Sequence, residues 1–415
     1  MTPLDAAADP RARPDELAAL ARHPAVAVRA RVAGNPAASL ETLLSLLGDF
    51  PVEVSTNAAL LLHQLSDPAL LLRSTAEQRQ RWALGWVLPG WVAEQLLAHG
   101  EGSVREMVAS NPACPLDILE RLALDPDAGV RAATAGNPGC SPGLLERLSR
   151  DDDHGVREAV AEHRECPPGV RERLASDTDA YVRAAVARSP EAPGASLRRL
   201  AGDASADVRR AAASNRSCPA AALERLAGDE LPVRSAVASN PACPPALLER
   251  LAADRNAAVR RAVARRPTCS RRLLDRLSSD RNAEVRAGVG GHPEAPAAVL
   301  ERLSTDGEAE VRAAVAGHPG CPAALLERLS ADADVAVRVA VASNAACSPD
   351  LLRQLDRAGR AGVRIALLGN PGWPPESLAR RAVVRHDYIR RSSEAVAGYP
   401  RELLERVMTG GPQGW

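Results

Sequence analysis

The sequence predicts an all-α solenoid built from two-helix repeats of about 26 residues. A Val-Arg pair recurs every 26 residues from Val104-Arg105 to Val208-Arg209, and again from Val233-Arg234 to Val363-Arg364 after one 25-residue step. Aspartate, Asn-Pro and Cys-Pro marks recur at fixed distances from this pair. A fixed period in this range indicates stacked units, each burying its apolar face only against its neighbours.

Residues 114–138 illustrate the predicted repeat, with two short helices. The apolar positions at helical spacing are Ile118, Leu119 and Leu122 on the first helix and Val130 and Ala133 on the second. Asp125 is expected to cap the second helix. Asn137-Pro138 is expected to end it, because a residue before proline is disfavoured in the α conformation.

Aspartate and arginine each occupy one slot of the repeat, and stacking turns such slots into rows. We therefore expect these aspartates to cap helices and to form an Asp–Arg hydrogen-bond ladder between layers. A catalytic carboxylate would be unique, whereas this one recurs. The representative ladder residues are Asp125, Arg131, Asp151, Arg157, Asp254 and Arg260.

The motif V-R-x-x-V-A-x-N-P-x-x-P-x-x-L-L-E-R-L, read here over residues 233–251, resembles the leucine-rich repeat variant family. The Asp-to-Arg spacing is also similar to that of HEAT repeats. The resemblance covers residues 100–378 well and the first 50 weakly, and it implies a right-handed superhelix of short helices. Some members carry an N-terminal iron–sulfur module held by cysteines. The first cysteine here is Cys114, inside the repeats, so we expect no such module, no cofactor and no metal.

Four segments are expected along the chain. Residues 1–56 carry N-terminal repeats, and residues 57–99 carry divergent, more apolar helical repeats. Residues 100–378 form the regular array, and residues 379–415 form a C-terminal cap and tail, since terminal repeats need a changed outer face.

Composition narrows the classes of function. Basic and acidic residues balance at 52 each, so the whole-chain charge favours neither nucleic acid nor an anionic membrane. The chain has no lysine, which excludes catalytic and phosphate-binding lysines, and it shows no known catalytic motif. The apolar stretch 83–93 is too short to span a bilayer, and no signal peptide is evident. We therefore expect a soluble, cytoplasmic protein that is not an enzyme and does not bind membranes.

The cysteines and most histidines also fall into repeat slots. Layers about 8–10 Å apart would hold neighbouring thiols too far apart for a disulfide or a shared zinc ion. Buried structural cysteines are the favoured interpretation, and a redox-sensing thiol at a helix N-terminus is the alternative. The histidines His163, His292 and His318 take the asparagine slot at the end of the second helix, and His23 and His99 take the aspartate slot.

Two clusters rise above the repeat background. Residues 255–281 carry nine arginines against two aspartates, a local charge of +7. From this run Arg260, Arg261, Arg265 and Arg266 are candidate partner-binding residues; a solvated arginine surface partly paired with aspartates is the alternative. Trp82 and Trp86 lie four residues apart on an expected helix and are candidate interface anchors, with core packing as the alternative.

The predicted function is a non-enzymatic scaffold that presents an extended concave surface to a protein or an acidic peptide. The second and sixth residues after each repeat valine are expected to face the partner, and they vary between repeats. The alternative is a nucleic-acid-binding solenoid that uses the Arg255–Arg281 patch. Some HEAT-like bacterial solenoids act as DNA glycosylases, but the aromatic and acidic groove residues of such a site are missing here.

Overall fold

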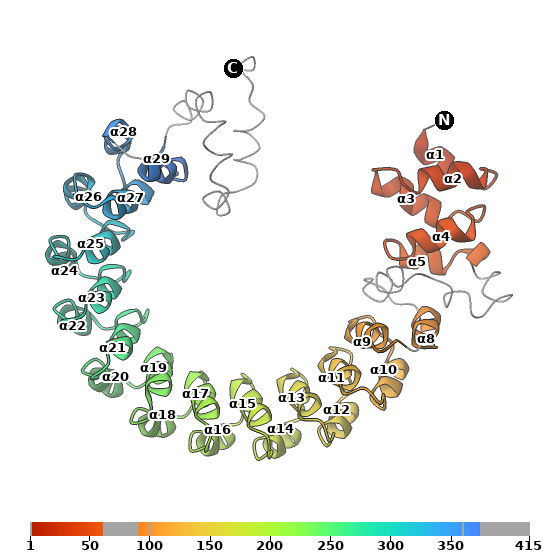
Figure 1. Cartoon of the computed structure of the whole chain (residues 1–415), viewed down its shortest axis with the longest axis horizontal. Coiled ribbons are helices and arrows are strands. Elements are labelled where there is room, and N and C mark those ends of the chain that lie inside the picture. Colours follow the sequence, from red (N-terminus) through yellow and green to blue (C-terminus); the bar gives the residue numbers. More distant parts are fainter. Residues whose placement is uncertain (1, 61–89, 99–100, 359–360, 374–415) are drawn as a thin grey trace. The chain divides into compact units, whose positions relative to one another are not determined.

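The computed structural model describes residues 2–60, 90–98, 101–358 and 361–373 (Figure 1). All regular elements in these residues are α-helices, so the predicted all-α solenoid is confirmed. The chain forms two compact units, residues 1–222 and 223–415. No helix in the described part of the chain is both long enough and apolar enough to cross a membrane.

In the first unit, each repeat contributes a first helix and a second helix. The first helices are α2 (Pro14–Leu20), α4 (Leu40–Leu46), α8 (Gly90–Ala98), α10 (Leu116–Leu122), α12 (Pro142–Leu148), α14 (Pro168–Leu174) and α16 (Gly194–Leu200), and α18 (Ala220–Leu226) contains the unit boundary. The second helices are α1 (Pro3–Ala8), α3 (Val26–Ala33), α5 (Pro51–Ser55), α9 (Gly102–Ser110), α11 (Ala128–Gly136), α13 (His154–Glu162), α15 (Ala180–Arg188) and α17 (Ala206–Ser214).

The second unit repeats this alternation. Its first helices are α20 (Pro245–Leu251), α22 (Arg271–Leu277), α24 (Ala297–Leu303), α26 (Ala323–Ser330) and α28 (Pro349–Ala358). Its second helices are α19 (Leu231–Ser239), α21 (Ala257–Ala264), α23 (Ala283–Gly290), α25 (Ala309–Ala316), α27 (Val335–Ser343) and α29 (Ala361–Leu368).

The second helices form the contact spine of each unit. In the first unit α9, α11, α13, α15 and α17 contact one another in order, and in the second unit the same holds from α19 to α29. The first helices lie on the other side of this row, one beside each second helix (Figure 1). We call the two sets the first-helix row and the second-helix row.

The core lies between the two rows. In one repeat Leu247, Leu248 and Leu251 are buried from the first helix, and Val259, Val263 and Ala264 are buried from the second. Each large apolar side chain contributes about 1.5–3 kcal/mol when buried. Helices of seven to nine residues are marginal alone, so this packing is what keeps them folded.

Local sequence marks the ends of the helices. Ser141 caps α12 by accepting a hydrogen bond from the amide of Leu144, and Pro142 occupies its first turn. At the other end of a repeat, Asn137 ends α11 in an extended conformation ahead of Pro138, as the Asn-Pro pair predicts.

The expected cap of α11 is wrong by two residues. Asp127 is the N-cap residue, and its carboxylate accepts a hydrogen bond from the amide of Gly129. The carboxylate of Asp125 instead accepts the amide of Asp127 and pairs with Arg105 of the preceding repeat. An aspartate two residues ahead of the helix is therefore free to join layers because another side chain caps the helix.

Each ladder arginine joins two repeats. Arg131 donates from Nε and Nη2 to the two carboxylate oxygens of Asp151, at 2.7 and 2.8 Å, and from Nη1 to the carbonyl of Asp125 at 2.8 Å. The same two-pronged pairing occurs at Arg105–Asp125, Arg157–Asp177 and Arg183–Asp203 in the first unit, and at Arg234–Asp254, Arg260–Asp280, Arg286–Asp306 and Arg312–Asp332 in the second.

A second ladder runs through the asparagine slot. The Nδ2 group of Asn344 donates to the carbonyls of Ala316 and His318, and its Oδ1 accepts the amide of Ala346. His318 serves the same purpose one repeat earlier, since its Nε2 bonds the carbonyl of His292 at 2.8 Å and its Nδ1 accepts the amide of Gly320 at 3.0 Å. Asparagine and histidine in this slot therefore join layers.

The asparagine ladder also includes a residue that the sequence pattern did not indicate. Asn57, assigned to the start of the divergent segment, donates to the carbonyls of Ala33 and Asn35. Asn35 in turn donates to the carbonyls of Ala7 and Asp9. The step from Asn35 to Asn57 is 22 residues, so a shortened repeat preserves the contact.

Replacing Asn344 with alanine should lower the free energy of unfolding. The change leaves the carbonyl of Ala316 and the amide of Ala346 without these partners and removes one of the two hydrogen bonds to the carbonyl of His318, which should cost about 2–4 kcal/mol. Urea unfolding followed by circular dichroism measures this decrease in the free energy of unfolding. Asn344→His is the matched control, because histidine occupies this slot at His318, and it should keep most of the stability. Equal loss in both variants would contradict the ladder.

Acid should weaken the Asp–Arg ladder. The hydrogen bonds from Arg286 lower the pKa of Asp306 against the opposing effect of its burial. A carboxyl group whose folded pKa is depressed stabilises the fold fully above its unfolded pKa of about 3.9, and this contribution disappears as the pH falls through the folded pKa. The stability gap between wild type and Asp306→Asn should thus be full at pH 7 and shrink below about pH 4. A gap unchanged down to pH 2 in urea titrations would refute this.

Candidate partner-binding surface

The exposed face of the second-helix row is set by one repeat position. The sixth residue after each repeat valine is exposed throughout the described array of both units. These residues are Ser110, Gly136, Glu162, Arg188 and Ser214 in the first unit, and Ser239, Arg265, Gly291, Gly317, Ser343 and Gly369 in the second. The second position after the valine, also predicted to face a partner, is half-buried in most repeats, buried at Ala184 and Ala287, and exposed at Glu106 and Arg210.

Two predicted partner-binding arginines are structural instead. Arg260 is buried, with its guanidinium paired to Asp280 and bonded to the carbonyl of Asp254. Arg266 is buried in the asparagine slot, where it donates to the carbonyls of Asn240 and Pro241. Since their donors are used inside the fold, the prediction that these two arginines contact a partner is wrong.

The other two candidates lie on the second-helix row. Arg261 is half-exposed and forms an ion pair with Glu284 of the next repeat. Arg265 is exposed, and its side chain has no hydrogen bond or ion pair with any described residue. Of these two candidates, Arg265 is therefore the one that offers an uncompensated guanidinium.

The arginine run 255–281 is not one surface. Arg271, Arg272 and Arg276 lie on α22 in the first-helix row, and Arg276 pairs with Glu249. Arg255 and Arg281 lie in the segments that precede the second helices α21 and α23. Two helices per repeat therefore distribute a charge that is continuous in sequence over separate faces.

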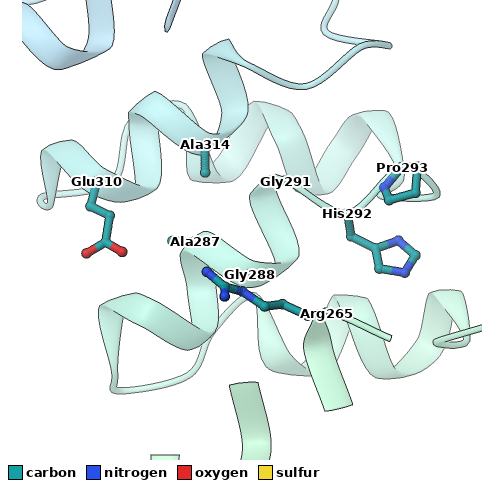
Figure 2. A pocket seen from close by; sticks show the side chains of 8 residues that line it. All are labelled: Arg265, Ala287, Gly288, Gly291, His292, Pro293, Glu310 and Ala314. Carbon is teal, nitrogen blue, oxygen red and sulfur yellow. The ribbon is translucent and has the colours of Figure 1, made fainter. Parts of the chain in front are cut away.

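A hollow of about 400 Å³ lies on the second-helix row beside Arg265. Its lining comes from three successive repeats: Arg265 after α21; Ala287, Gly288, Gly291, His292 and Pro293 in and after α23; and Glu310 and Ala314 on α25. Figure 2 shows the Arg265 side chain extending over Gly288 toward Ala287, with Glu310 on the α25 side. Arg265 and Glu310 are both exposed.

The hollow exists because the floor is made of small residues. The third position after the repeat valine is alanine in the other second helices of this unit and glycine at Gly288. A Cβ placed there would lie 3.4 Å from the Cβ of Ala264 and 3.4 Å from the Cγ of Arg265. Packing therefore tolerates alanine at this position, and a longer side chain would have to displace Arg265 or extend into the hollow.

Charge in the hollow is unpaired on both sides. Like Arg265, the Glu310 side chain has no hydrogen bond or ion pair with a described residue. His292 contributes no free group, because its Nε2 bonds the carbonyl of Arg266 at 2.7 Å and its Nδ1 accepts the amide of Glu294. Sequence reasoning missed Gly288 and Glu310; the signal available was a glycine in a slot held by alanine in the other second helices of this unit.

The first unit presents a different exposed group. Tyr181 is 65% exposed, and its ring lies 6.2 Å from that of His154 in the preceding repeat. Arg188 pairs with both Glu158 and Glu162 on the same helix row. Charges are compensated here, in contrast to the hollow.

The tryptophan candidates Trp82 and Trp86 lie outside the described residues, as does His99. Trp373, which replaces cysteine in its slot, is buried. The interface role assigned to the two tryptophans stays a prediction.

The eight cysteines are free and buried. Burial raises the pKa of Cys114 to about 12 and that of Cys140 to about 11. A redox-sensing thiol requires a lowered pKa and exposure, so these surroundings oppose that alternative. Within the described part of the chain, no cluster of histidine, cysteine and carboxylate side chains could hold a metal ion.

Comparison with known families identifies the repeats. The family model "Leucine Rich Repeat Variant domain" matches residues 207–267, and the model "Leucine rich repeat variant" matches residues 103–127, 128–153 and 309–334. Residues 103–153, 207–267 and 309–334 are therefore leucine-rich repeat variant repeats. The resemblance drawn from the sequence motif is thereby confirmed.

Solved structures with some similarity include two repeat proteins. One is a leucine-rich repeat variant with a novel repetitive structural motif: it is 29% identical, the match covers 53% of this chain and 87% of that one, and the TM-score is 0.40. The other is a set of computationally designed armadillo repeat proteins for modular peptide recognition, at 14% identity, 73% and 95% coverage and a TM-score of 0.11. No curated protein matches the chain.

The thiols should be unreactive in the folded leucine-rich repeat variant array. With Ellman's reagent at pH 8, we expect little reaction in buffer and release of eight equivalents in denaturant, because burial both covers the sulfur atoms and disfavours the thiolate. A thiol that reacts rapidly in the native protein would contradict the structural interpretation and restore the redox alternative.

Proposed function

We propose that this protein is a non-enzymatic scaffold that binds a protein or a peptide through the exposed face of its second-helix row. The observation that carries the proposal is the sixth repeat position. Its residue is exposed in every described repeat of the array and changes from serine to glycine, glutamate or arginine, whereas the Val-Arg pair recurs in each of these repeats. Repeat proteins use such rows as extended binding surfaces.

The ladders support this division of roles. The repeat aspartates and arginines pair between layers, and the asparagine slot bonds the backbone of the preceding layer. Side chains committed to these bonds cannot serve a partner or a reaction without weakening the frame. The variable positions are therefore the ones available for recognition.

The nucleic-acid alternative has less support. It depended on a phosphate-binding patch at residues 255–281, but Arg260 and Arg266 are buried and the exposed arginines of the run lie on both helix rows. Proteins that bind phosphate backbones cluster their basic side chains on one face. We favour a reducing cytoplasm as the compartment, since the eight cysteines are free.

A photo-crosslinking experiment tests the scaffold proposal. The full chain carries p-benzoylphenylalanine at Ser239 on the second-helix row or, as matched control, at Ala324 on the first-helix row; both positions are exposed. After irradiation in lysate of the native cell, half of each sample is treated with nuclease. We expect a protein crosslinked through the probe at Ser239, absent with the probe at Ala324 and unaffected by nuclease. Equal crosslinking from both positions, or a product that nuclease removes, would count against the scaffold.

A further inference from the structure

The hollow between α21 and α25 differs from the rest of the second-helix row in two ways. It is the place where Gly288 replaces the usual alanine, and where a guanidinium and a carboxylate face the same space without partners among the described residues. One repeat earlier, Arg261 and Glu284 form an ion pair. The unpaired state of Arg265 and Glu310 is therefore a local feature of the hollow.

The two charged groups that border the hollow, the Arg265 guanidinium and the Glu310 carboxylate, indicate which ligand groups it can bind. Arg265 can pair with a carboxylate, and Glu310 can pair with an ammonium or guanidinium group. Between them the floor of Ala287, Gly288 and Gly291 offers small residues that allow a backbone to approach closely. At about 400 Å³, the space lies within the range of about 300–1,000 Å³ typical of ligand sites.

The Glu310 carboxylate also disfavours binding of a polyanion in the hollow. A nucleic-acid strand pairing its phosphates with Arg265 would bring further phosphates near Glu310, and like charges that meet in an interface cost affinity. A segment with one acidic and one basic side chain pairs with both walls. The two walls come from either side of α23, so an extended peptide, which rises about 3.3 Å per residue, crosses from one to the other within a few residues.

We propose that this hollow binds an extended peptide segment that carries an acidic and a basic side chain two to four residues apart. The acidic side chain pairs with Arg265, the basic side chain pairs with Glu310, and small residues between them lie on Gly288. This inference rests on the proposed scaffold function and names its site and its class of partner.

Defined peptides test the inference with the full-length protein. The probes are ten-residue peptides of alanine, serine and glycine with blocked ends and a neutral fluorophore. The mixed-charge set carries one glutamate and one lysine two, three or four residues apart in both orders; reference peptides carry two glutamates, two lysines or neither. Fluorescence anisotropy gives Kd. We expect the best mixed-charge peptide to bind at least about fivefold tighter than any reference peptide, and more weakly at high salt.

Variants locate the binding. Arg265→Glu should weaken binding of the mixed-charge peptide by about tenfold. The same variant should bind the two-lysine peptide more tightly than wild type does, and misfolding cannot produce such a gain. Gly288→Leu should abolish binding by filling the hollow without changing charge. Arg272→Glu is the matched control, because Arg272 is exposed near the start of α22 on the other row, and it should bind like wild type.

The outcomes separate the two proposals. Equal affinity of wild type, Arg265→Glu and Gly288→Leu for every peptide, or tightest binding of the two-glutamate peptide, overturns the inference. If the Ser239 probe still crosslinks a protein in that case, the scaffold proposal survives and its contact site lies elsewhere on the row. If the Ser239 probe also crosslinks nothing, both proposals fail.

Discussion

The pairing of each repeat arginine with the aspartate of the following repeat is the interaction on which this structure depends. A single guanidinium holds the backbone of its own repeat and both carboxylate oxygens of the next, and that carboxylate also holds the amide two residues further on. The aspartates are only 7–11% exposed, so a lost partner would leave a charge nearly without water. The pairing therefore fixes both the spacing of layers and the loop that starts each second helix.

The sequence was sufficient to predict the repeat frame, because periodic slots report which residues occupy equivalent positions. It also predicted that aspartates and arginines pair between layers, but not which aspartate pairs with which arginine. Asp125 and Asp127 both precede α11, both can cap a helix, and a strict period looks the same whether an arginine pairs with the repeat before it or with the one after it. The pairing over 20 residues depends on how the layers stack, which is a property of the folded chain.

For the candidate site, in contrast to the repeat frame, the sequence predicted little of what the structure shows. A run of arginines in sequence suggested a patch, but alternation of two helices sends neighbours to different faces, and Arg266 falls in the asparagine slot where its donors turn inward. Slot counting alone would have removed Arg266 from the candidates. The hollow could not be predicted from the sequence, because its walls and floor come from three repeats. In addition, the position of the carboxylate on the next helix decides that Arg261 is paired and Arg265 is not.

The bonds that join the layers and the exposed residues of the second-helix row contribute separately to the free energy of the protein. This separation explains how a frame this regular can carry specific recognition. The ladders satisfy the buried polar groups at fixed slots, so exchange of an exposed residue at the sixth position leaves them intact and should alter stability by no more than about 0.5 kcal/mol. In a stack where each layer contacts only its neighbours, such a change also stays local. Recognition at Arg265, Gly288 and Glu310 can therefore change one layer at a time, because none of the three belongs to the Asp–Arg or asparagine-slot bonds that join the layers.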